Sequence, residues 1–193
     1  MCDTRCRTLS MGKIYFITGN KNKFTEIKAV LLGIEQLDIE VPEIQEIDAH
    51  EIIRKKLESA RKHAKGEFMV EDTSLYFECL NGLPGPLIKW FIKTIGIDGL
   101  ADLAEKLGNN TAEAKTIIGY AGKREEILFF EGVIKGKIVP PRGEKRFDWD
   151  RIFVPERHQK TFAEMGMEEK NKISMRRMAV NKLKEFLDAQ VHE

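Results

Sequence analysis

The feature that most constrains the fold is an apolar segment that runs directly into a glycine turn and then into an amphipathic helix. Residues 13–18 are rich in β-branched and aromatic side chains, as in a buried strand, and Gly19 and Asn20 follow as a turn. Between Asn22 and Leu32 the apolar residues are three, three and one positions apart, which predicts a helix with one apolar face. A strand, a loop and a helix in this order are typical of α/β proteins.

The remaining chain continues this alternation and then changes to consecutive strands. Asp48 is the expected N-cap of a second helix, and Gly96 is expected to separate two further helices. The predicted strands are 37–41, 68–70 continuing through 74–77, 116–120, 127–131, 133–139 and 151–154. The predicted helices are 48–65, 87–94, 98–107 and 168–191, the last with Met178 among its inward residues. The sequence therefore predicts an α/β fold on a mixed sheet.

Length, charge and cysteine content exclude several classes of protein. At 193 residues and 42% hydrophobic residues, the chain can bury one substantial core, so we expect a single domain over 13–193 after a disordered extension over 1–12. The net charge of +1 argues against a nucleic-acid-binding surface. No apolar run approaches the roughly 20 residues that span a bilayer. Cys2, Cys6 and Cys79 fit neither a disulfide framework nor a zinc site, so we expect a cytoplasmic protein.

The first candidate site is the turn Thr18-Gly19-Asn20-Lys21-Asn22-Lys23. A glycine allows a tight turn, the start of the following helix offers backbone N–H groups, and the lysines add positive charge, which together suit phosphate. The GxxxxGK[ST] pattern of a Walker A loop is absent. An ordinary solvated turn is the alternative interpretation of the same residues.

The second candidate site is Glu71-Asp72-Thr73, which follows the apolar residues 68–70. We expect these carboxylates at a strand end, where ligands of α/β sheets usually bind, and buried carboxylates are unfavourable unless they meet a cation. Mg²⁺ is the natural candidate because it takes carboxylate, phosphate and water oxygens, and Glu43 is a possible second ligand. The alternative is that Asp72 only caps a helix or a turn.

Two further groups of residues fit a nucleobase. Phe147, Asp148, Trp149 and Asp150 place two aromatic rings among two acids, so that a ring can stack a base and a carboxylate can accept from a ring N–H. Lys170, Met175 and Arg176 lie near the start of the final predicted helix, where Arg176 could donate to a base carbonyl. For the first group, the alternative is a loop with buried aromatic rings and solvent-exposed acids. For the second group, the alternative is the solvent-exposed face of a helix.

The four groups, in this order, resemble the inosine/xanthosine triphosphate pyrophosphatase family. The resemblance runs from about Lys13 to Leu187 and is closest to the eukaryotic type. It rests on the stretches FITGNKNK, VPEIQ, VEDTSLYF, GLPGPLIKWF, GKIVPPRG, FDWD, TFAEM and EKN. It implies an elongated, two-lobed α/β domain on a long mixed sheet with helices on both faces, an active-site cleft between the lobes, and a homodimer.

The resemblance also implies an activity and a set of site residues. The expected reaction is hydrolysis of inosine, deoxyinosine and xanthosine triphosphates between the α and β phosphates, giving the monophosphate and pyrophosphate. Glu43 and Asp72 would bind Mg²⁺ or Mn²⁺, and Asp72 would position or deprotonate the attacking water, assisted by Glu71 and Lys23. The implied triphosphate-binding residues are Thr18, Gly19, Asn20, Lys21, Asn22, Lys23, Lys56, Asp72, Thr73 and Lys89.

The implied base pocket departs from the family pattern at two positions. Phe147 would stack the purine, and Asp150, Lys170 and Arg176 would read its edge. Asp148 stands where the family usually has glycine, and Met175 stands where it usually has a histidine, whose hydrogen bond a thioether cannot replace. A shifted base preference, and a nucleotide-binding protein with weakened catalysis, therefore remain alternatives to the expected activity.

Overall fold

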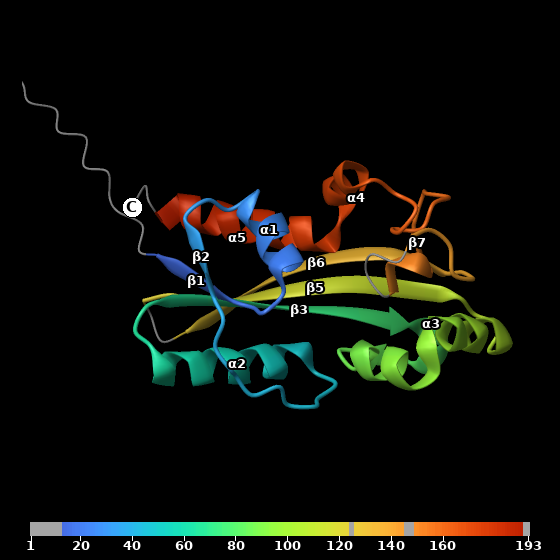
Figure 1. Ribbon diagram of the computed structural model, residues 1–193, viewed down its shortest axis with the longest axis horizontal. Coiled ribbons are helices and arrows are strands. Elements are labelled where there is room, and N and C mark those ends of the chain that lie inside the picture. Colours follow the sequence, from blue (N-terminus) through green and yellow to red (C-terminus); the bar gives the residue numbers. More distant parts are fainter. Residues whose placement is uncertain (1–12, 124–125, 145–148, 191–193) are drawn as a thin grey trace, which may run out of the picture.

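A seven-stranded mixed sheet runs through the whole molecule (Figure 1). The computed structural model describes residues 13–123, 126–144 and 149–190, so the expected extension over 1–12 and the candidate residues Phe147 and Asp148 lie outside the described residues. The strands are β1 Ile14–Ile17, β2 Ile34–Leu37, β3 Glu67–Phe77, β4 Pro84–Gly85, β5 Thr111–Ala121, β6 Ile127–Ile138 and β7 Phe153–Pro155. The helices are α1 Lys21–Lys28, α2 Ala49–His63, α3 Ile88–Lys106, α4 Met167–Ile173 and α5 Met175–Gln190, with short 3₁₀ turns η1 Glu78–Leu80 and η2 Trp149–Arg151.

The sheet has a short parallel part and a long antiparallel part. The strand order is β2-β1-β3-β5-β6-β7, with β4 paired to β3 off this path. β1 is parallel to both β2 and β3, whereas the β3–β5, β5–β6 and β6–β7 pairs are antiparallel. The three long strands β3, β5 and β6 connect the two ends of the molecule. The predicted mixed sheet is confirmed.

The helices cover both faces of this sheet. α2 packs on one face through Ile53 and Leu57, which are fully buried, and Asp48 caps it by accepting the His50 backbone N–H at 2.8 Å, as the sequence predicts. α1 and α5 lie together on the other face, where Ile27 and Leu183 belong to one buried cluster. Within the described part of the chain, no helix is long and apolar enough to cross a membrane.

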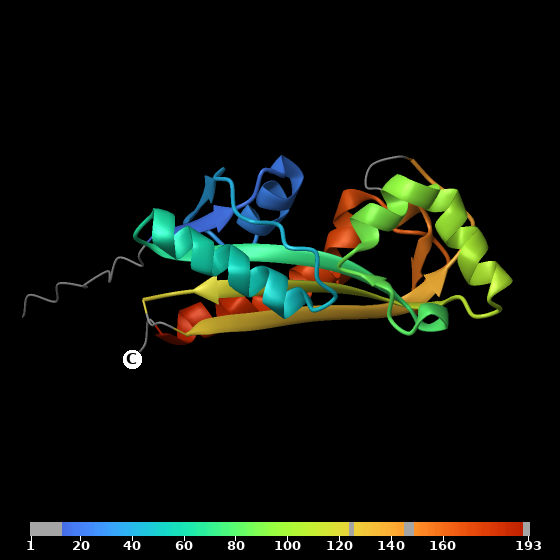
Figure 2. The same ribbon diagram turned by 90° about the horizontal axis from the view of Figure 1, so that it is seen from below.

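The elements gather into two halves along the long strands (Figure 2). β1, β2, α1 and α2 lie around one end of the strands, and α3, β7 and α4 lie around the other. The second half has its own apolar cluster, in which Phe77, Leu100, Phe153 and Phe162 are buried. The sheet therefore joins two lobes, as the resemblance implies.

Several predicted boundaries are wrong, each for a physical reason. The strand expected over 37–41 is β2, and it ends at Leu37 because its partner β1 ends at Ile17, opposite Leu37. The segments 127–131 and 133–139 are one strand, β6, which continues through Gly132. The strand expected from Arg151 begins at Phe153, because η2 occupies the preceding residues.

The final predicted helix is two helices. Ser174 is extended, with φ −66° and ψ 144°, and separates α4 from α5. Met178 is 41% exposed instead of facing the core, because the buried stripe of α5 follows Ala179, Val180, Leu183 and Leu187 and Met178 lies on another face of the helix. The break predicted at Gly96 is confirmed, since its φ of 73° and ψ of 175° interrupt α3.

Gly132 lets the start of α5 lie directly on β6, and this gives a prediction. A Cβ atom at this position would lie 1.9 Å from the carbonyl oxygen of Met175. We expect Gly132→Ala to lower the free energy of unfolding by about 3 kcal/mol, the upper end for an overpacked interior, as measured by urea denaturation. Gly166→Ala is the matched control, because a Cβ there meets nothing within 4 Å, and it should change stability by less than about 1 kcal/mol. Equal stability of the two variants would contradict the close packing.

Candidate active site

The site lies at a gap in one edge of β3. β1 pairs with β3 only from Glu67 to Met69, and β4 pairs with it only at Leu75 and Tyr76. Within the part of the chain that the structure describes, the segment 70–74 therefore has no strand neighbour on that side, although β5 pairs with it on the other. The sequence prediction that Glu71 and Asp72 end a strand is wrong, because they lie in the middle of β3. The strand that ends beside them is β1.

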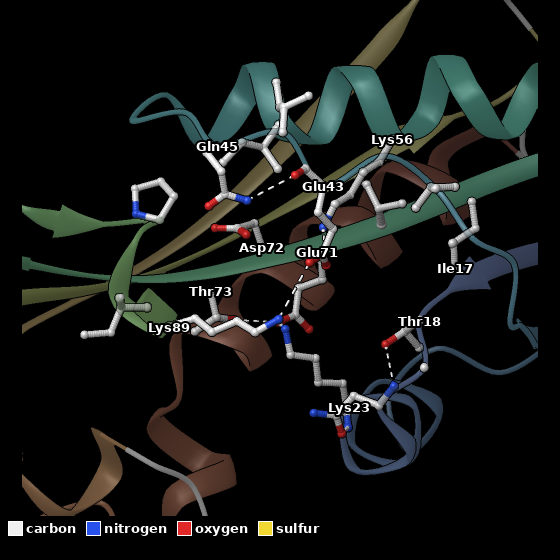
Figure 3. Close-up of a pocket in the computed structure, with 18 of the residues that line it drawn as sticks. Ile17, Thr18, Lys23, Glu43, Gln45, Lys56, Glu71, Asp72, Thr73 and Lys89 are labelled. Atoms are coloured by element: carbon white, nitrogen blue, oxygen red, sulfur yellow. Dashed lines mark hydrogen bonds and ion pairs between the residues drawn. The ribbon is translucent and has the colours of Figure 1, made fainter. Parts of the chain in front are cut away.

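A pocket of about 540 Å³ opens at this gap, and both halves of the molecule line it (Figure 3). One half contributes the turn after β1, the segment between β2 and α2, and Lys56 of α2. The other half contributes the start of α3, including Lys89 and Trp90. Because the pocket lies at an open strand edge, it is reached by side chains from both faces of β3.

The turn after β1 is built by local hydrogen bonds. Asn20 caps α1, since its side-chain oxygen accepts the backbone N–H groups of Asn22 and Lys23 at 3.0 and 3.2 Å. The Thr18 hydroxyl accepts the Asn20 N–H at 3.1 Å, and Gln36 of β2 donates to the Thr18 carbonyl at 2.7 Å. These bonds fix the turn at the pocket wall and direct the N-terminus of α1 towards it. Such an arrangement favours an anion.

Asp72 is the acid of β3 on the α2 face of the sheet. Burial raises the pKa of its carboxyl above the ordinary value, against the opposing hydrogen bond from Ser74 and the charges of Lys23 and Lys56. The Ser74 hydroxyl donates to one Asp72 oxygen at 2.7 Å. An acid whose charge is only partly compensated and which faces a pocket is suited to hold a cation or to accept a proton.

Glu43 lines the same pocket as Asp72 and lies between two lysines (Figure 3). Its carboxylate is 3.3 Å from the Lys56 ammonium and 3.7 Å from that of Lys89. The charge of Lys56, and then that of Lys89, lowers the pKa of Glu43 below its ordinary value. Glu43 is thus ionised near neutral pH and is held loosely, because its side chain is 61% exposed.

Glu71, the neighbouring acid, points to the opposite face and is already fully engaged. Arg176 of α5 binds both carboxylate oxygens of Glu71, with Nε and Nη2 donating at 2.8 and 3.0 Å. The Lys23 ammonium lies 3.2 Å from one of these oxygens. The Thr73 hydroxyl also donates to Glu71. Burial alone would raise the pKa of Glu71, but the charges of Arg176 and Lys23 outweigh it and hold the pKa well below the ordinary range. These contacts fit a role in positioning Arg176 and Lys23.

Arg176 joins this centre to a third acid, Glu26 of α1. The Arg176 guanidinium donates to Glu26, whose other carboxylate oxygen is buried and has no hydrogen-bond partner among the described residues. Burial would lower the pKa of Arg176, but Glu71 and Glu26 outweigh it and raise the pKa above its ordinary value. The alternative interpretation of this region as the solvent-exposed face of a helix is therefore wrong for Arg176, which is buried between two carboxylates.

A second buried ion pair continues from Arg176 into the other half. Lys170 of α4 and Asp150 of η2 are both buried, and their charged atoms are 2.5 Å apart. Burial raises the pKa of Asp150, although the charges of Lys170 and Arg176 oppose this. Trp149 packs edge-on against Phe153 at 5.9 Å between ring centres and so supports the turn. Met175 is 2% exposed and belongs to the apolar cluster of this half.

The structure thus sorts the candidate residues into two connected groups. The pocket brings together Thr18, Gly19, Asn20, Lys23, Glu43, Lys56, Glu71, Asp72, Thr73 and Lys89. Lys21 and Asn22 are exposed in the first turn of α1, beside the pocket lining. Asp150, Lys170 and Arg176 form the buried group next to it. Sequence reasoning assigned no role to Glu26, Gln45 or Trp90. The three-residue spacing from Lys23 places Glu26 on the same helix face, and the stretches VPEIQ and GLPGPLIKWF contain Gln45 and Trp90.

The donor atoms of the pocket fit a divalent cation supplied together with phosphate. No group of three or more metal-binding side chains occurs among the residues that the structure describes. Glu43 and Asp72 nevertheless both offer carboxylate oxygens to one pocket. Mg²⁺ commonly takes one or two carboxylates, with phosphate and water oxygens completing its shell.

The fold and the pocket together define an α/β protein with a carboxylate- and lysine-lined cleft suited to a polyphosphate and a divalent cation. Residues 14–186 match the Ham1 family, and the chain belongs to that family. It is 40% identical over 184 residues to the inosine triphosphate pyrophosphatase of Schizosaccharomyces pombe, covering 93% of this chain and 97% of the relative. The Saccharomyces cerevisiae protein of the same name is 41% identical over 194 residues, covering 93% and 98%.

Solved structures show the same fold. A HAM1 protein from Coxiella burnetii superposes with a TM-score of 0.81 at 27% identity, over 93% of this chain and 100% of that one. The elongated mixed-sheet architecture is therefore that of the family.

The buried Arg176 gives a second prediction. Arg176→Met leaves Glu71 and Glu26 without their shared cation, and we expect a loss of about 3–5 kcal/mol in the free energy of unfolding at pH 7. The loss should shrink towards pH 5, because without Arg176 the pKa of buried Glu71 rises and protonation removes the unpaired charge. Urea denaturation followed by circular dichroism at both pH values measures this.

The neighbouring arginine provides the control for this experiment. Arg177→Met changes an exposed side chain and should shift stability by less than about 0.5 kcal/mol. In the unaltered protein, Glu71 stabilises the fold fully above its ordinary pKa, and this stabilisation is lost only as the pH falls through its lower folded pKa. Equal stability of the two variants would show that Arg176 does not neutralise Glu71.

Proposed function

We propose that this chain hydrolyses noncanonical purine nucleoside triphosphates, such as those of inosine, deoxyinosine and xanthosine, to the monophosphate and pyrophosphate. The observation that carries the proposal is the pocket itself, in which Asp72 faces Glu43 and the lysines Lys23, Lys56 and Lys89. The relatives named inosine triphosphate pyrophosphatase support the substrate class. The protein is accordingly an enzyme, a nucleoside triphosphate pyrophosphatase.

The triphosphate is proposed to lie between the turn after β1 and the start of α3. Lys23 and Lys56 are largely shielded from solvent, whereas Lys89 is 78% exposed and can follow a ligand. Positive charge around the bridging and nonbridging oxygens stabilises the negative charge that builds up during phosphoryl transfer. Thr18, Gly19, Asn20 and Thr73 would contribute polar and backbone contacts, with Lys21 and Asn22 at the rim. The residues therefore favour catalysis by positioning and electrostatics.

Glu43 and Asp72 are the residues proposed to hold Mg²⁺, or Mn²⁺ in its place. A bound divalent ion supplies Lewis-acid stabilisation of the phosphate oxygens. In the free protein Glu43 is occupied by Lys56 and Lys89. Its transfer to a cation would release both lysines to the phosphates, so that ion binding and substrate binding support each other.

Asp72 is also proposed to position the attacking water and to accept its proton. Burial raises the pKa of this carboxyl while no cation is bound to it, which favours the transfer of a proton to any Asp72 oxygen that the cation leaves free. Ser74 holds one of the Asp72 oxygens at 2.7 Å and so fixes the direction of the other. Glu71 would assist indirectly, by fixing Lys23 at 3.2 Å.

The purine is proposed to bind beside the buried group of Asp150, Lys170 and Arg176. Hypoxanthine and xanthine carry a carbonyl at C6 and an N1–H, which match a cationic donor and a carboxylate acceptor. Adenine reverses this pattern, and leaving buried groups unpaired disfavours it strongly. Phe147 and Asp148 belong to the same proposed pocket, and Trp149 supports it through Phe153.

A shifted base preference is the second candidate, and Met175 is the observation that favours it. This side chain is buried in an apolar cluster and provides no hydrogen-bond donor for a base. A panel of inosine, xanthosine, adenosine and guanosine triphosphates, run beside Met175→His, separates the two candidates. An unchanged ranking of substrates between the two proteins would remove Met175 from the specificity determinants.

We further propose a cytoplasmic homodimer that binds neither nucleic acid nor membranes. Leu32 and Ile47 are 82% and 65% exposed, and contact with a second copy would bury such side chains. Cys79 has a free thiol, which suits a reducing compartment. The balanced charge of the chain supports the absence of a nucleic-acid partner.

The product of the reaction tests the proposed function. Inosine triphosphate with Mg²⁺ should yield the monophosphate and one pyrophosphate, as resolved by ion-exchange chromatography. Asp72→Asn should lower kcat by at least about 100-fold, because it removes both a proton acceptor and a charged ligand. Asp98→Asn, at an exposed position on α3, is the matched control and should leave kcat unchanged. Release of orthophosphate alone, or full activity of Asp72→Asn, would contradict the proposal.

A further inference from the structure

The segment 38–48, which carries Glu43, has no helix or strand of its own. It links β2 to α2 and lines the pocket together with β3. A cation site that uses Glu43 nevertheless needs this side chain in a defined place relative to Asp72, because ligand geometry must be held within fractions of an ångström. The contacts that fix the segment therefore decide whether the site is assembled before the ligand arrives.

The ion pairs of Glu43 are poor candidates for this task. Glu43 lies 3.3 Å from the Lys56 ammonium and 3.7 Å from that of Lys89. Lys56 and Lys89 are also the groups that a triphosphate would attract. Contacts that are exchanged when the substrate binds cannot hold Glu43 in place while it is bound.

A second set of contacts involves neutral groups and is not subject to this exchange. The indole Nε1–H of Trp90 donates to the side-chain oxygen of Gln45, and the Gln45 amide nitrogen donates to the backbone carbonyl of Glu43 at 3.1 Å. One side chain thus connects the start of α3 to the backbone of the residue that carries the carboxylate. Gln45 lies beside Glu43 at the pocket in Figure 3.

Trp90 is itself connected, through backbone hydrogen bonds, to the strand that carries Asp72. The backbone N–H of Trp90 donates to Leu87, and that of Leu87 donates to Pro84 of β4, at 2.8 and 3.0 Å. β4 pairs with β3 at Leu75 and Tyr76, a few residues after Asp72. The chain of contacts from Glu43 through Gln45 and Trp90 therefore ends on the same strand as the second carboxylate.

We propose that Gln45 and Trp90 form a clasp that positions Glu43 for the divalent cation by tying the segment 38–48 to the start of α3. This inference rests on the cation-binding role of Glu43 in the proposed function. Both are positioning residues, since they act through Glu43. The clasp joins the two halves of the molecule across the pocket and prepares the cation site before the lysines move to the phosphates.

Two single variants and their combination test the clasp in the full chain. Gln45→Ala removes the bridging amide, and Trp90→Phe removes the N–H donor but keeps an aromatic ring. Each should weaken the binding of Mn²⁺ alone, measured by electron paramagnetic resonance of the free ion, by about tenfold, as is typical when an outer partner of a metal ligand is lost. The double variant should be no weaker than the singles, because all three lose the same connection.

Kinetics and a matched control separate positioning from general damage. The Mg²⁺ concentration for half-maximal hydrolysis of inosine triphosphate should rise about tenfold in each variant, while kcat at saturating Mg²⁺ stays within about twofold. Lys93→Gln is the control, because Lys93 lies 5.3 Å from the Trp90 ring on the same helix but is exposed. Its affinity for Mn²⁺ should equal that of the unaltered protein.

The outcomes distinguish the clasp from the proposed function. If the unaltered protein releases pyrophosphate, but Gln45→Ala and Trp90→Phe bind Mn²⁺ as tightly as it does, the clasp alone would be overturned. A fall in kcat without a change in metal affinity, which indicates structural damage, would also overturn the clasp alone. If both variants bind Mn²⁺ more weakly but the unaltered protein releases no pyrophosphate, the clasp would be supported and the proposed function would be overturned. A wild type that binds no Mn²⁺ would overturn the clasp and the cation-binding role of Glu43 together.

Discussion

The site depends on the open edge of β3 between β1 and β4. Strand neighbours end at Met69 and resume at Leu75, so the backbone between them faces a cavity instead of another strand. Because side chains alternate along a strand, Glu71 and Asp72 point to opposite faces, yet both reach the pocket at this edge. If another strand were paired along this edge, the sheet would lie between the two side chains, and they could not line the same pocket.

The alternation divides the work between the two acids. Glu71 faces α1 and α5, where Arg176, Lys23 and Thr73 satisfy its carboxylate. Asp72 faces α2, where compensation is weaker and burial raises its pKa. The two neighbouring acids thus have pKa values shifted in opposite directions, because they face different sides of one sheet. One acid anchors a buried network that runs towards Asp150 and Lys170, and the other remains available to a cation and a water molecule.

Much of the fold follows from local patterns in the sequence, and the differences arise where distant segments meet. The Asn20 turn, the Asp48 cap and the Gly96 break are local, and the sequence predicts each of them. Gly132 looks like a turn in the sequence but lies within β6, because α5 packs against it. The pocket residues could be predicted because motifs mark them. The roles of Glu26, Gln45 and Trp90 could not, although the stretches VPEIQ and GLPGPLIKWF contain the last two, because each acts through a partner that is distant in the chain.

We propose that Glu43 and Asp72 hold one divalent cation beside a lysine-lined channel. Anomalous scattering from Mn²⁺ in crystals grown with an inosine triphosphate analogue that carries an imido group between the α and β phosphates measures the position of that cation directly. The account predicts a Mn²⁺ peak bonded to carboxylate oxygens of both residues and to phosphate oxygens, with Glu71 still bound to Arg176. A peak that contacts neither Glu43 nor Asp72, or that is bonded to Glu71, would contradict it.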